Sequence, residues 1–284
     1  MRVVVSLLIS TVSLSAACAD LPAESTKQAT VVTANRVTAN RVTANRVTAN
    51  RLPANRLMSS RLSDGRLTVN MDTAGKLLSS EDGREVFSFI VSCALPSDVF
   101  LEADVDGTTF EFAGEMGLTP EWLTSPLTPE GQGWISACIF ARVNSSDVAL
   151  PISMRGTNQA LASDADERAG WSVEEGAFYG NLFTPLDQPI LWIACRGAGQ
   201  AAGESGGLIE RDCAEPDPAN PGLTKCGFIY AGDCGAYSND QACEQFSASG
   251  TFYRRCHRAP LFHPIKNGGM NPAFSQVITT YVTP

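Results

Sequence analysis

Apolar residues crowd two segments of the chain in a pattern typical of buried helices. The first covers residues 82–95 and carries Val86, Phe87, Phe89, Ile90 and Val91. We expect it to stop before Pro96, because proline lacks the amide hydrogen that the next helical turn needs. The second runs from Trp134 to Val143. A helix that is apolar on nearly every side must be buried, so both are expected in the core.

Alternation of apolar and polar residues predicts short strands in the same part of the chain. Residues 100–105 and 108–112 alternate on either side of Asp106-Gly107. An Asp-Gly pair between such arms is a strong signal for a tight β-hairpin. Further strand candidates cover residues 148–154, 189–195, 227–230, 251–256 and 275–282. The fold class expected from these elements is α+β, with two buried helices and short antiparallel strands in one domain.

A five-residue repeat precedes this domain. VTANR occurs four times unchanged from Val32 to Arg51, then decays through LPANR, LMSSR and LSDGR towards Met71. A period of five matches neither a helix nor a flat strand, because only a chain that turns every five residues keeps Val and Leu on one side. This pattern resembles the pentapeptide-repeat β-solenoid. Such a coil would stack Arg36 over Arg56 with like charges in register, so a disordered basic tether is the alternative.

The beginning of the chain is typical of an exported protein. Arg2, an apolar run from Val3 to Leu14 and small residues before Cys18 predict a secretory signal peptide over residues 1–17. The junction Leu14-Ser15-Ala16-Ala17-Cys18 resembles a bacterial lipobox, in which Cys18 carries acyl chains. The alternative to this lipid anchor is cleavage by the ordinary signal peptidase, after Ala17 or after Ala19. The expected organisation is a signal peptide (1–17), a linker (18–31), a repeat segment (32–71) and a cysteine-rich globular domain (72–284).

The cysteines point to an oxidising compartment. Eight follow Cys18, and we expect all of them in disulfides: Cys93, Cys138, Cys195, Cys213, Cys226, Cys234, Cys243 and Cys256. Their pairing is not fixed by the sequence. Residues 196–246 are dominated by Gly, Pro and Cys, so cross-links must hold a stretch that buries little apolar surface. Within the helical runs, Cys93 and Cys138 could instead be small buried apolar residues.

The net charge of −9 is divided unevenly along the chain. Residues 1–76 carry 10 basic and 4 acidic side chains, whereas residues 77–284 carry 11 and 26, which gives +6 and −15. An acidic domain repels phosphate backbones, so nucleic acid is not an expected partner. The basic repeat could contact anionic envelope polymers or lipid headgroups.

One motif could carry catalysis. Gly203-Glu204-Ser205-Gly206-Gly207 fits the G-x-S-x-G nucleophile elbow and also resembles the stretch around the nucleophile of chymotrypsin-like proteases. The protease order needs a His before the Ser, but His257 and His263 both follow it. A hydrolase order would use Ser205, Asp212 or Asp233, and His257. Because no strand leads into the motif and no helix follows it, we favour a flexible turn and expect no catalytic site.

Candidate metal ligands are also weak. Glu102, Asp104 and Asp106 mimic the opening of a calcium-binding EF-hand loop, but Ala113 stands where the closing Glu should be. His257 and His263 do not have the spacing of one helix face, and exported cysteines pair with one another rather than bind zinc. We therefore expect neither a metal nor another cofactor.

Two adjacent carboxylates, Glu174 and Glu175, stand before a Gly-flanked aromatic pair. A glycosidase places its two carboxyl groups across one substrate bond, whereas neighbours on an extended chain point apart. We therefore predict a turn at this position rather than a catalytic pair.

Several segments together resemble a group of uncharacterised bacterial lipoproteins and secreted proteins. They are the Asn-containing repeat, Val91-Ser92-Cys93-Ala94-Leu95-Pro96, Trp134-Ile135-Ser136-Ala137-Cys138, Ala141-Arg142-Val143-Asn144, Met154-Arg155-Gly156 and the Cys-rich end. The resemblance covers most of residues 32–260 and implies an envelope location without any catalytic residue. The expected function is that of a non-catalytic, lipid-anchored envelope surface protein with an envelope polymer or protein as partner. It would be an outer-membrane or periplasmic lipoprotein, or extracellular. A secreted serine hydrolase that uses Ser205 and His257 is the alternative.

Overall fold

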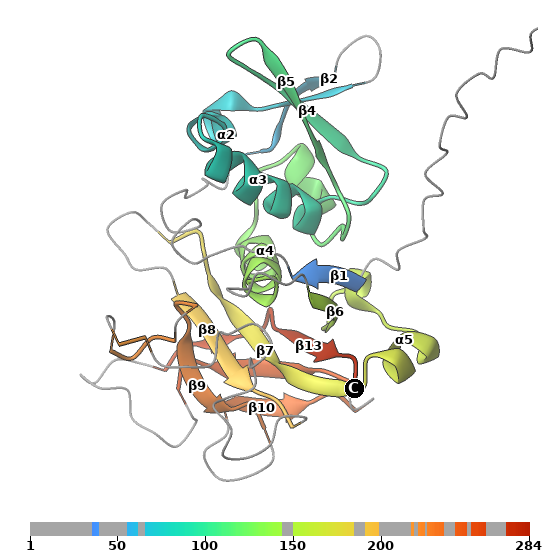
Figure 1. The fold of residues 1–284 in the computed structure, drawn as a ribbon, viewed down its shortest axis with the longest axis vertical. Helices are drawn as coiled ribbons and strands as arrows, with labels where there is room; N and C mark the ends of the chain where they lie inside the picture. The colour runs from blue at the N-terminus through green and yellow to red at the C-terminus, as the bar shows by residue number, and fades with distance from the viewer. Residues whose placement is uncertain are drawn as a thin grey trace, which may run out of the picture. The chain divides into compact units, whose positions relative to one another are not determined.

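The structure is a computed structural model of the 284-residue chain. It describes residues 36–39, 56–61, 66–143, 150–184, 191–198, 217–218, 221–224, 226–235, 242–248, 251–259 and 271–284. All of them belong to one compact unit, Val32–Pro284 (Figure 1). They form α-helices and three sheets that are mainly antiparallel, which confirms the α+β class.

The first sheet has four strands in the order β2-β3-β4-β5. Its strands are β2 (Met58–Arg61), β3 (Leu67–Val69), β4 (Phe100–Val105) and β5 (Thr108–Ala113). Only the β3–β4 pair is parallel. The predicted hairpin is confirmed: Asp106 and Gly107 connect β4 to β5, and both have positive φ, +51° and +81°. A two-residue hairpin turn that matches the right-handed twist of its strands needs positive φ at both central residues.

Two helices pack beside this sheet, α2 (Met71–Leu78) and α3 (Glu81–Ala94). The α3 helix corresponds to the first predicted helix. Ser80 caps it by accepting a hydrogen bond from the backbone N–H of Gly83, and Leu95 is already extended before Pro96. Side-chain capping satisfies an amide that the first turn leaves without a partner. The beginning and the end of α3 are therefore both set by local residues.

The second predicted helix is α4 (Pro129–Ala141), which begins earlier than the apolar pattern indicated. Thr128 caps it through the N–H of Gly131, and Pro129 occupies the first turn, where its missing N–H costs nothing. A disulfide joins Cys93 of α3 to Cys138 of α4, with Cα atoms 6.1 Å apart. This bond rules out the alternative interpretation, in which the two cysteines are only small buried apolar residues.

The second sheet has six strands in the order β1-β6-β13-β7-β8-β9. Its strands are β1 (Arg36–Ala39), β6 (Leu150–Arg155), β13 (Ile278–Val282), β7 (Val173–Asn181), β8 (Leu191–Arg196) and β9 (Ile229–Asp233). All neighbours are antiparallel except β8 and β9. The strands predicted at 148–154, 189–195, 227–230 and 275–282 all fall here. The longest of the described strands, β7, was not predicted.

A third sheet consists of β10 (Cys243–Phe246), β11 (Tyr253–His257) and β12 (Ala273–Phe274). This third sheet covers one face of the six-stranded sheet. This is clear from the strands β7 and β8, whose successive residues belong to two different cores. Phe178, Trp192 and Ala194 join α3 and α4 in the first core. Their strand neighbours Tyr179 and Ile193 belong to the second core, whose other members include residues of β10 and β11. Side chains of a strand alternate between faces, so the six-stranded sheet is buried on both.

The described residues of the repeat segment do not form a closed coil. Arg36–Ala39 adds to the outer edge of β6, whereas Met58–Arg61 pairs with β3 in a different sheet. A segment that pairs through its main chain with the edge strand of a sheet does not have to turn every five residues. Arg36–Ala39 is therefore extended. The rest of the five-residue repeat lies outside the described residues.

The hairpin turn provides a test of the fold. A Cβ on Gly107 would touch nothing within 4 Å, but φ there is +81°. Gly107→Ala should therefore lower the free energy of unfolding by about 1–2 kcal/mol through backbone conformation alone, as measured by urea denaturation. Gly170→Ala is the matched control, because it also meets open space at the end of α5 (Ala165–Gly170) without a positive φ. Equal effects of the two substitutions would contradict the assigned turn.

Candidate functional site

The second core is built around four cysteines from four successive parts of the fold. Cys195 lies near the end of β8, Cys234 directly follows β9, Cys243 begins β10 and Cys256 lies on β11. We call these four residues the sulfur cluster. Gly176 of β7 lets the strand carrying Cys195 approach closely, since a Cβ on Gly176 would stand 2.3 Å from the Cys195 carbonyl oxygen.

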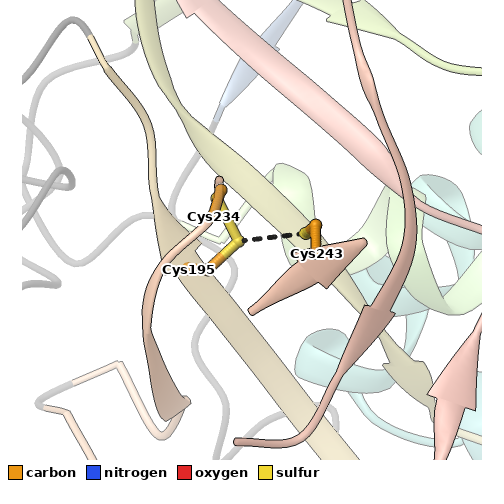
Figure 2. Close-up of side chains that lie close together, drawn as sticks. All are labelled: Cys195, Cys234 and Cys243. Carbon is orange, nitrogen blue, oxygen red and sulfur yellow. Dashed lines mark hydrogen bonds between the residues drawn. A yellow bond between two sulfur atoms is a disulfide. The ribbon is translucent and has the colours of Figure 1, made fainter. Parts of the chain in front are cut away.

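The sulfur cluster contains two disulfides in contact with each other. Cys195 is bonded to Cys234, and Cys243 to Cys256. The Sγ atoms of Cys195 and Cys243, which belong to different disulfides, are 3.8 Å apart (Figure 2). Neither of them carries a hydrogen, so this is van der Waals contact rather than a hydrogen bond. All four side chains are buried, with at most 2 % of any residue exposed.

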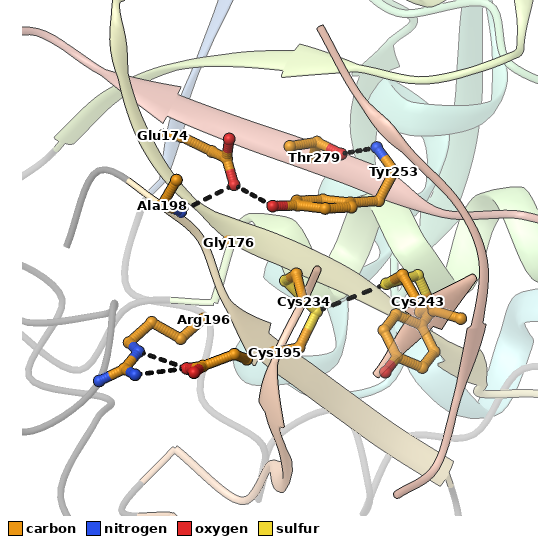
Figure 3. The surroundings of a disulfide bond; sticks show 12 residues. Glu174, Gly176, Cys195, Arg196, Ala198, Cys234, Cys243, Tyr253 and Thr279 are labelled. Atoms are coloured by element: carbon orange, nitrogen blue, oxygen red, sulfur yellow. Dashed lines mark hydrogen bonds and ion pairs between the residues drawn. A yellow bond between two sulfur atoms is a disulfide. The ribbon is translucent and has the colours of Figure 1, made fainter. Parts of the chain in front are cut away.

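Polar groups that are buried or half-buried lie around the sulfur cluster (Figure 3). Glu174 accepts hydrogen bonds at Oε1 from the Tyr253 hydroxyl, at 2.7 Å, and from the backbone N–H of Ala198, at 2.9 Å. The Arg196 guanidinium pairs with Asp233. A buried carboxylate that accepts two hydrogen bonds recovers much of what it loses by leaving water. These contacts therefore anchor β7, β8 and β11 to one another.

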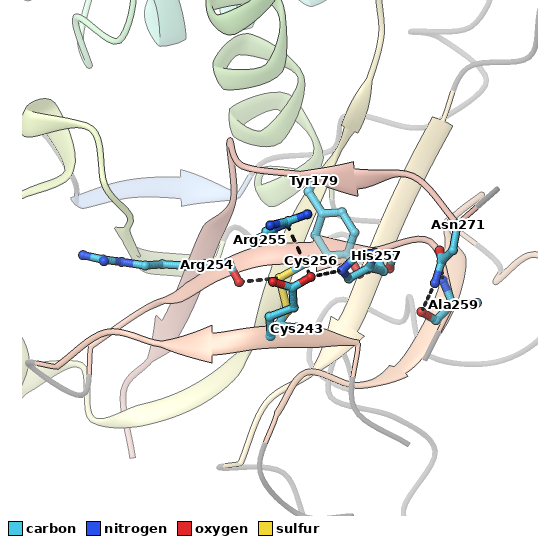
Figure 4. A network of polar contacts seen from close by, with 9 residues as sticks. Tyr179, Cys243, Arg254, Arg255, Cys256, His257, Ala259 and Asn271 are labelled. Carbon is cyan, nitrogen blue, oxygen red and sulfur yellow. Dashed lines mark hydrogen bonds and ion pairs between the residues drawn. A yellow bond between two sulfur atoms is a disulfide. The ribbon is translucent and has the colours of Figure 1, made fainter. Parts of the chain in front are cut away.

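His257 stands in a second polar group, beside the Cys243–Cys256 disulfide (Figure 4). Its Nε2 lies 2.8 Å from Glu244 Oε1, and the Arg255 Nε lies 3.4 Å from the same oxygen. The Tyr179 hydroxyl donates to the His257 carbonyl oxygen at 2.6 Å. Burial raises the pKa of Tyr179 well above its usual range, so that hydroxyl keeps its proton and remains a donor.

The structure brings together only part of the predicted hydrolase constellation. Ser205 lies outside the described residues, as do Asp212 and His263. Asp233 is described, but it pairs with Arg196 and not with His257. The carboxylate beside His257 is that of Glu244, which belongs to no motif in the sequence. Its signal was faint, because Glu244 and His257 are 13 residues apart and meet only when β10 pairs with β11.

The predicted disulfides are confirmed for the six cysteines already paired above. Cys226 is also disulfide-bonded, although its partner is not among the described residues. Cys18 and Cys213 fall outside the described part of the chain. As disulfides, the clustered sulfurs offer no thiolate, which is the form that binds metal. The cluster as described is therefore a set of cross-links.

The prediction of a turn at Glu174 and Glu175 is wrong. Both lie in β7 and are buried. Glu175 accepts a hydrogen bond from the Thr280 hydroxyl at 2.7 Å, so each carboxylate has its own partner. Gly176, which follows the pair, allows the close approach of β7 to β8. The two residues have a structural role rather than that of a catalytic pair.

Two buried arginines were also missed. Arg142 donates from Nη1 to Ser92 Oγ at 2.7 Å and lies over the Phe89 ring, while burial lowers its pKa and Glu115 opposes that shift. Arg155 donates from Nε to Ser153 at 3.0 Å and stacks over a tyrosine ring. Arginine is mostly exposed in proteins, so nothing in the sequence marks these two as buried.

No protein-family model, curated protein or solved structure matches this chain. Within the residues that the structure describes, no helix has the length and apolar character needed to span a bilayer. The site must therefore be interpreted from its own chemistry. Two buried disulfides, two carboxylates with partners and a His–Glu pair whose carboxylate is partly exposed form a densely bonded group.

The Tyr253 hydroxyl tests the importance of this group. Tyr253→Phe removes a hydrogen bond to a buried carboxylate, so we expect a loss of about 1–3 kcal/mol in the free energy of unfolding. Tyr253 is 4 % exposed, whereas Tyr230 is 46 % exposed, and Tyr230→Phe should change stability by less than about 0.5 kcal/mol. Urea denaturation of both variants measures the difference. A neutral Tyr253→Phe would mean that Glu174 does not depend on this contact.

Proposed function

We propose that this chain is a cell-envelope surface protein with a binding or structural role, held to a membrane by acyl chains on Cys18. The observation that supports it best is the sulfur chemistry. Three disulfides among the described residues indicate an oxidising, exported environment. Two of them replace part of an apolar core, which is a device of exported domains.

The charge distribution favours a role at the envelope. The repeat carries an Arg every five residues, and the domain after residue 76 has a net charge of −15. A basic segment is attracted to anionic lipid headgroups or polymers, while an acidic domain is repelled from the same surface. The proposed arrangement places the repeat as a spacer near the membrane and the cross-linked domain outward, where it meets an envelope polymer or a protein partner. The resemblance to bacterial lipoproteins and secreted proteins supports the same proposal.

Export and acylation are tested by the mass of the mature protein, expressed from the full chain in a bacterium with a lipoprotein pathway. We expect cleavage before Cys18, an added acyl mass, and no uptake of a thiol-alkylating reagent until the protein is reduced. After a high-salt wash, which screens any attraction of the repeat to lipid, Cys18→Ala should leave the membrane fraction without opening any disulfide, whereas the acylated protein should stay. A mature protein that is folded with free thiols in the cytoplasm would contradict the proposal.

The repeat has its own test. The unacylated Cys18→Ala chain should sediment with phosphatidylglycerol vesicles at low salt. It should stay in the supernatant as salt rises, because salt screens the attraction between exposed charges. Vesicles of phosphatidylcholine are the control for charge. Replacing Arg41, Arg46 and Arg51 by Gln should abolish sedimentation while the unfolding midpoint stays unchanged. Retention that is independent of these arginines would assign membrane binding to another part of the chain.

A secreted serine hydrolase remains the second candidate, and the His257–Glu244 contact favours it. A carboxylate on one imidazole nitrogen orients the ring and leaves the other for the nucleophile. Here Glu244 meets Nε2, so Ser205 would have to reach Nδ1, which is buried and has no partner among the described residues. A fluorophosphonate probe decides between the two functions: labelling that disappears in both Ser205→Ala and His257→Ala would establish the hydrolase. Absence of labelling in the folded wild-type protein would rule out the serine hydrolase.

A further inference from the structure

The two disulfides of the sulfur cluster are in contact through one sulfur of each. Cys195 Sγ and Cys243 Sγ are 3.8 Å apart, and the sulfurs of Cys195, Cys234 and Cys243 all lie within 4.8 Å of one another. Thiol–disulfide exchange requires a thiolate to touch a disulfide sulfur. A thiolate released at Cys243 would already be in contact with the Cys195–Cys234 bond. The cluster thus contains both reactants of an internal exchange.

The present bonds connect neighbouring strands rather than the two layers of the second core. The Cys195–Cys234 bond links β8 to the end of β9, within the six-stranded sheet. The Cys243–Cys256 bond links directly opposed residues of β10 and β11, within the three-stranded sheet. Among the described cysteines, no bond crosses from one sheet to the other. A Cys195–Cys243 bond would cross between them.

The backbone beside Cys256 is strained in the described state. Arg255 has a φ of +44°, in the left-handed region that a bulky side chain rarely adopts. It lies between Arg254 and Cys256 on β11, and Cys256 is tied to the opposite strand. Opening the bond at Cys256 removes one of the restraints that hold Arg255 in this conformation. Strain therefore favours release of Cys256 over its retention.

We propose that the sulfur cluster is an exchange centre whose reactant is an external dithiol, and that its two-electron reduced form carries a Cys195–Cys243 disulfide with free thiols at Cys234 and Cys256. This inference rests on the part of the proposed function that closes the cysteines in an oxidising compartment. It adds a chemical activity to cross-links that are otherwise only structural.

The exchange balances in three substitutions at sulfur. Cys256 is buried in the described state, so attack requires local opening of β11. A thiolate of the dithiol then attacks Cys256, forming a mixed disulfide and releasing the Cys243 thiolate. That thiolate attacks Cys195, forms the Cys195–Cys243 bond and releases Cys234, which takes up a proton. The second thiol of the dithiol then attacks its own sulfur in the mixed disulfide and releases Cys256, which takes up the other proton. The dithiol loses two electrons and two protons, and the protein gains them as two thiols in place of one disulfide.

The consequence for the domain is that losing one disulfide does not separate the layers of the second core. Before the exchange, packing and hydrogen bonds hold the three-stranded sheet to β8, whereas afterwards a covalent bond joins β8 to β10. A domain that meets reductants then keeps its two sheets together until both pairs are consumed. The freed thiols at Cys234 and Cys256 are the groups through which an oxidant would restore the original state.

The test uses the mature wild-type protein and one equivalent of dithiothreitol. Free thiols are blocked with an alkylating reagent under acid quench, and the disulfide-linked peptides are identified by mass spectrometry. We expect molecules with two new alkylated sites in the cluster to carry them at Cys234 and Cys256, with Cys195 linked to Cys243. If these molecules instead retain Cys195–Cys234 or Cys243–Cys256, the exchange is refuted.

Two double variants provide an independent readout. Cys234→Ser with Cys256→Ser leaves the two sulfurs in contact, and we expect them to form a disulfide in the exported protein. Cys195→Ser with Cys243→Ser is the matched control, because Cys256 is not part of the group within 4.8 Å, and we expect two free thiols. Should the first variant fold with both thiols free, the proposal is overturned. If it fails to fold, the titration of the wild type still decides.

The starting state separates this inference from the proposed function. Thiols that are free before any reductant is added contradict an exported, cross-linked protein. Thiols that are closed at the start but give a product retaining either original bond contradict only the exchange.

Discussion

Contact between two disulfides at the centre of the second core is the interaction on which the six-stranded sheet depends. One face of that sheet is covered by α4 and a large apolar core, whereas within the described part of the chain the other face meets a three-stranded sheet. Of the 11 buried residues that the structure describes in the second core, four are the cysteines of the sulfur cluster. Apolar surface is therefore scarce there, and cross-links contribute what hydrophobic burial does not, by restricting the unfolded chain.

Burial of the sheet on both faces explains why charged groups lie deep inside. Glu167 accepts a hydrogen bond from Ser153, which in turn accepts one from Arg155, so three strongly polar side chains share one network. Breaking such a network leaves a charge without a partner and costs more than the network contributes. The same logic applies to Glu174 beside the sulfur cluster and to Glu175, which accepts a hydrogen bond from Thr280. The polar interior fixes how β6, β7 and β13 pack, and no substrate is needed to account for it.

Local signals in the sequence predicted those elements that local residues determine. The hairpin at Asp106-Gly107 and the end of α3 at Pro96 follow from turn chemistry and from the missing amide of proline, and both are present as expected. The strand β7 was missed because its residues are buried on both faces, which removes the alternation that marks a strand. The early start of α4 was also missed, although Thr128 and Pro129 carry a recognisable capping pattern.

The candidate site was predictable in composition but not in arrangement. The number of cysteines and the signal for export predicted disulfides. Their pairing depends on which strands meet, and β10 and β11 are short strands that lie far from β8 in the sequence. The dependence of the second core on its cross-links is measured by hydrogen exchange of the backbone amides of Cys234, Cys243 and His257, before and after all disulfides are reduced and alkylated. These amides should lose their protection, while those of the β4–β5 hairpin, which contains no cysteine, should keep most of theirs. Equal protection in both states would contradict this dependence.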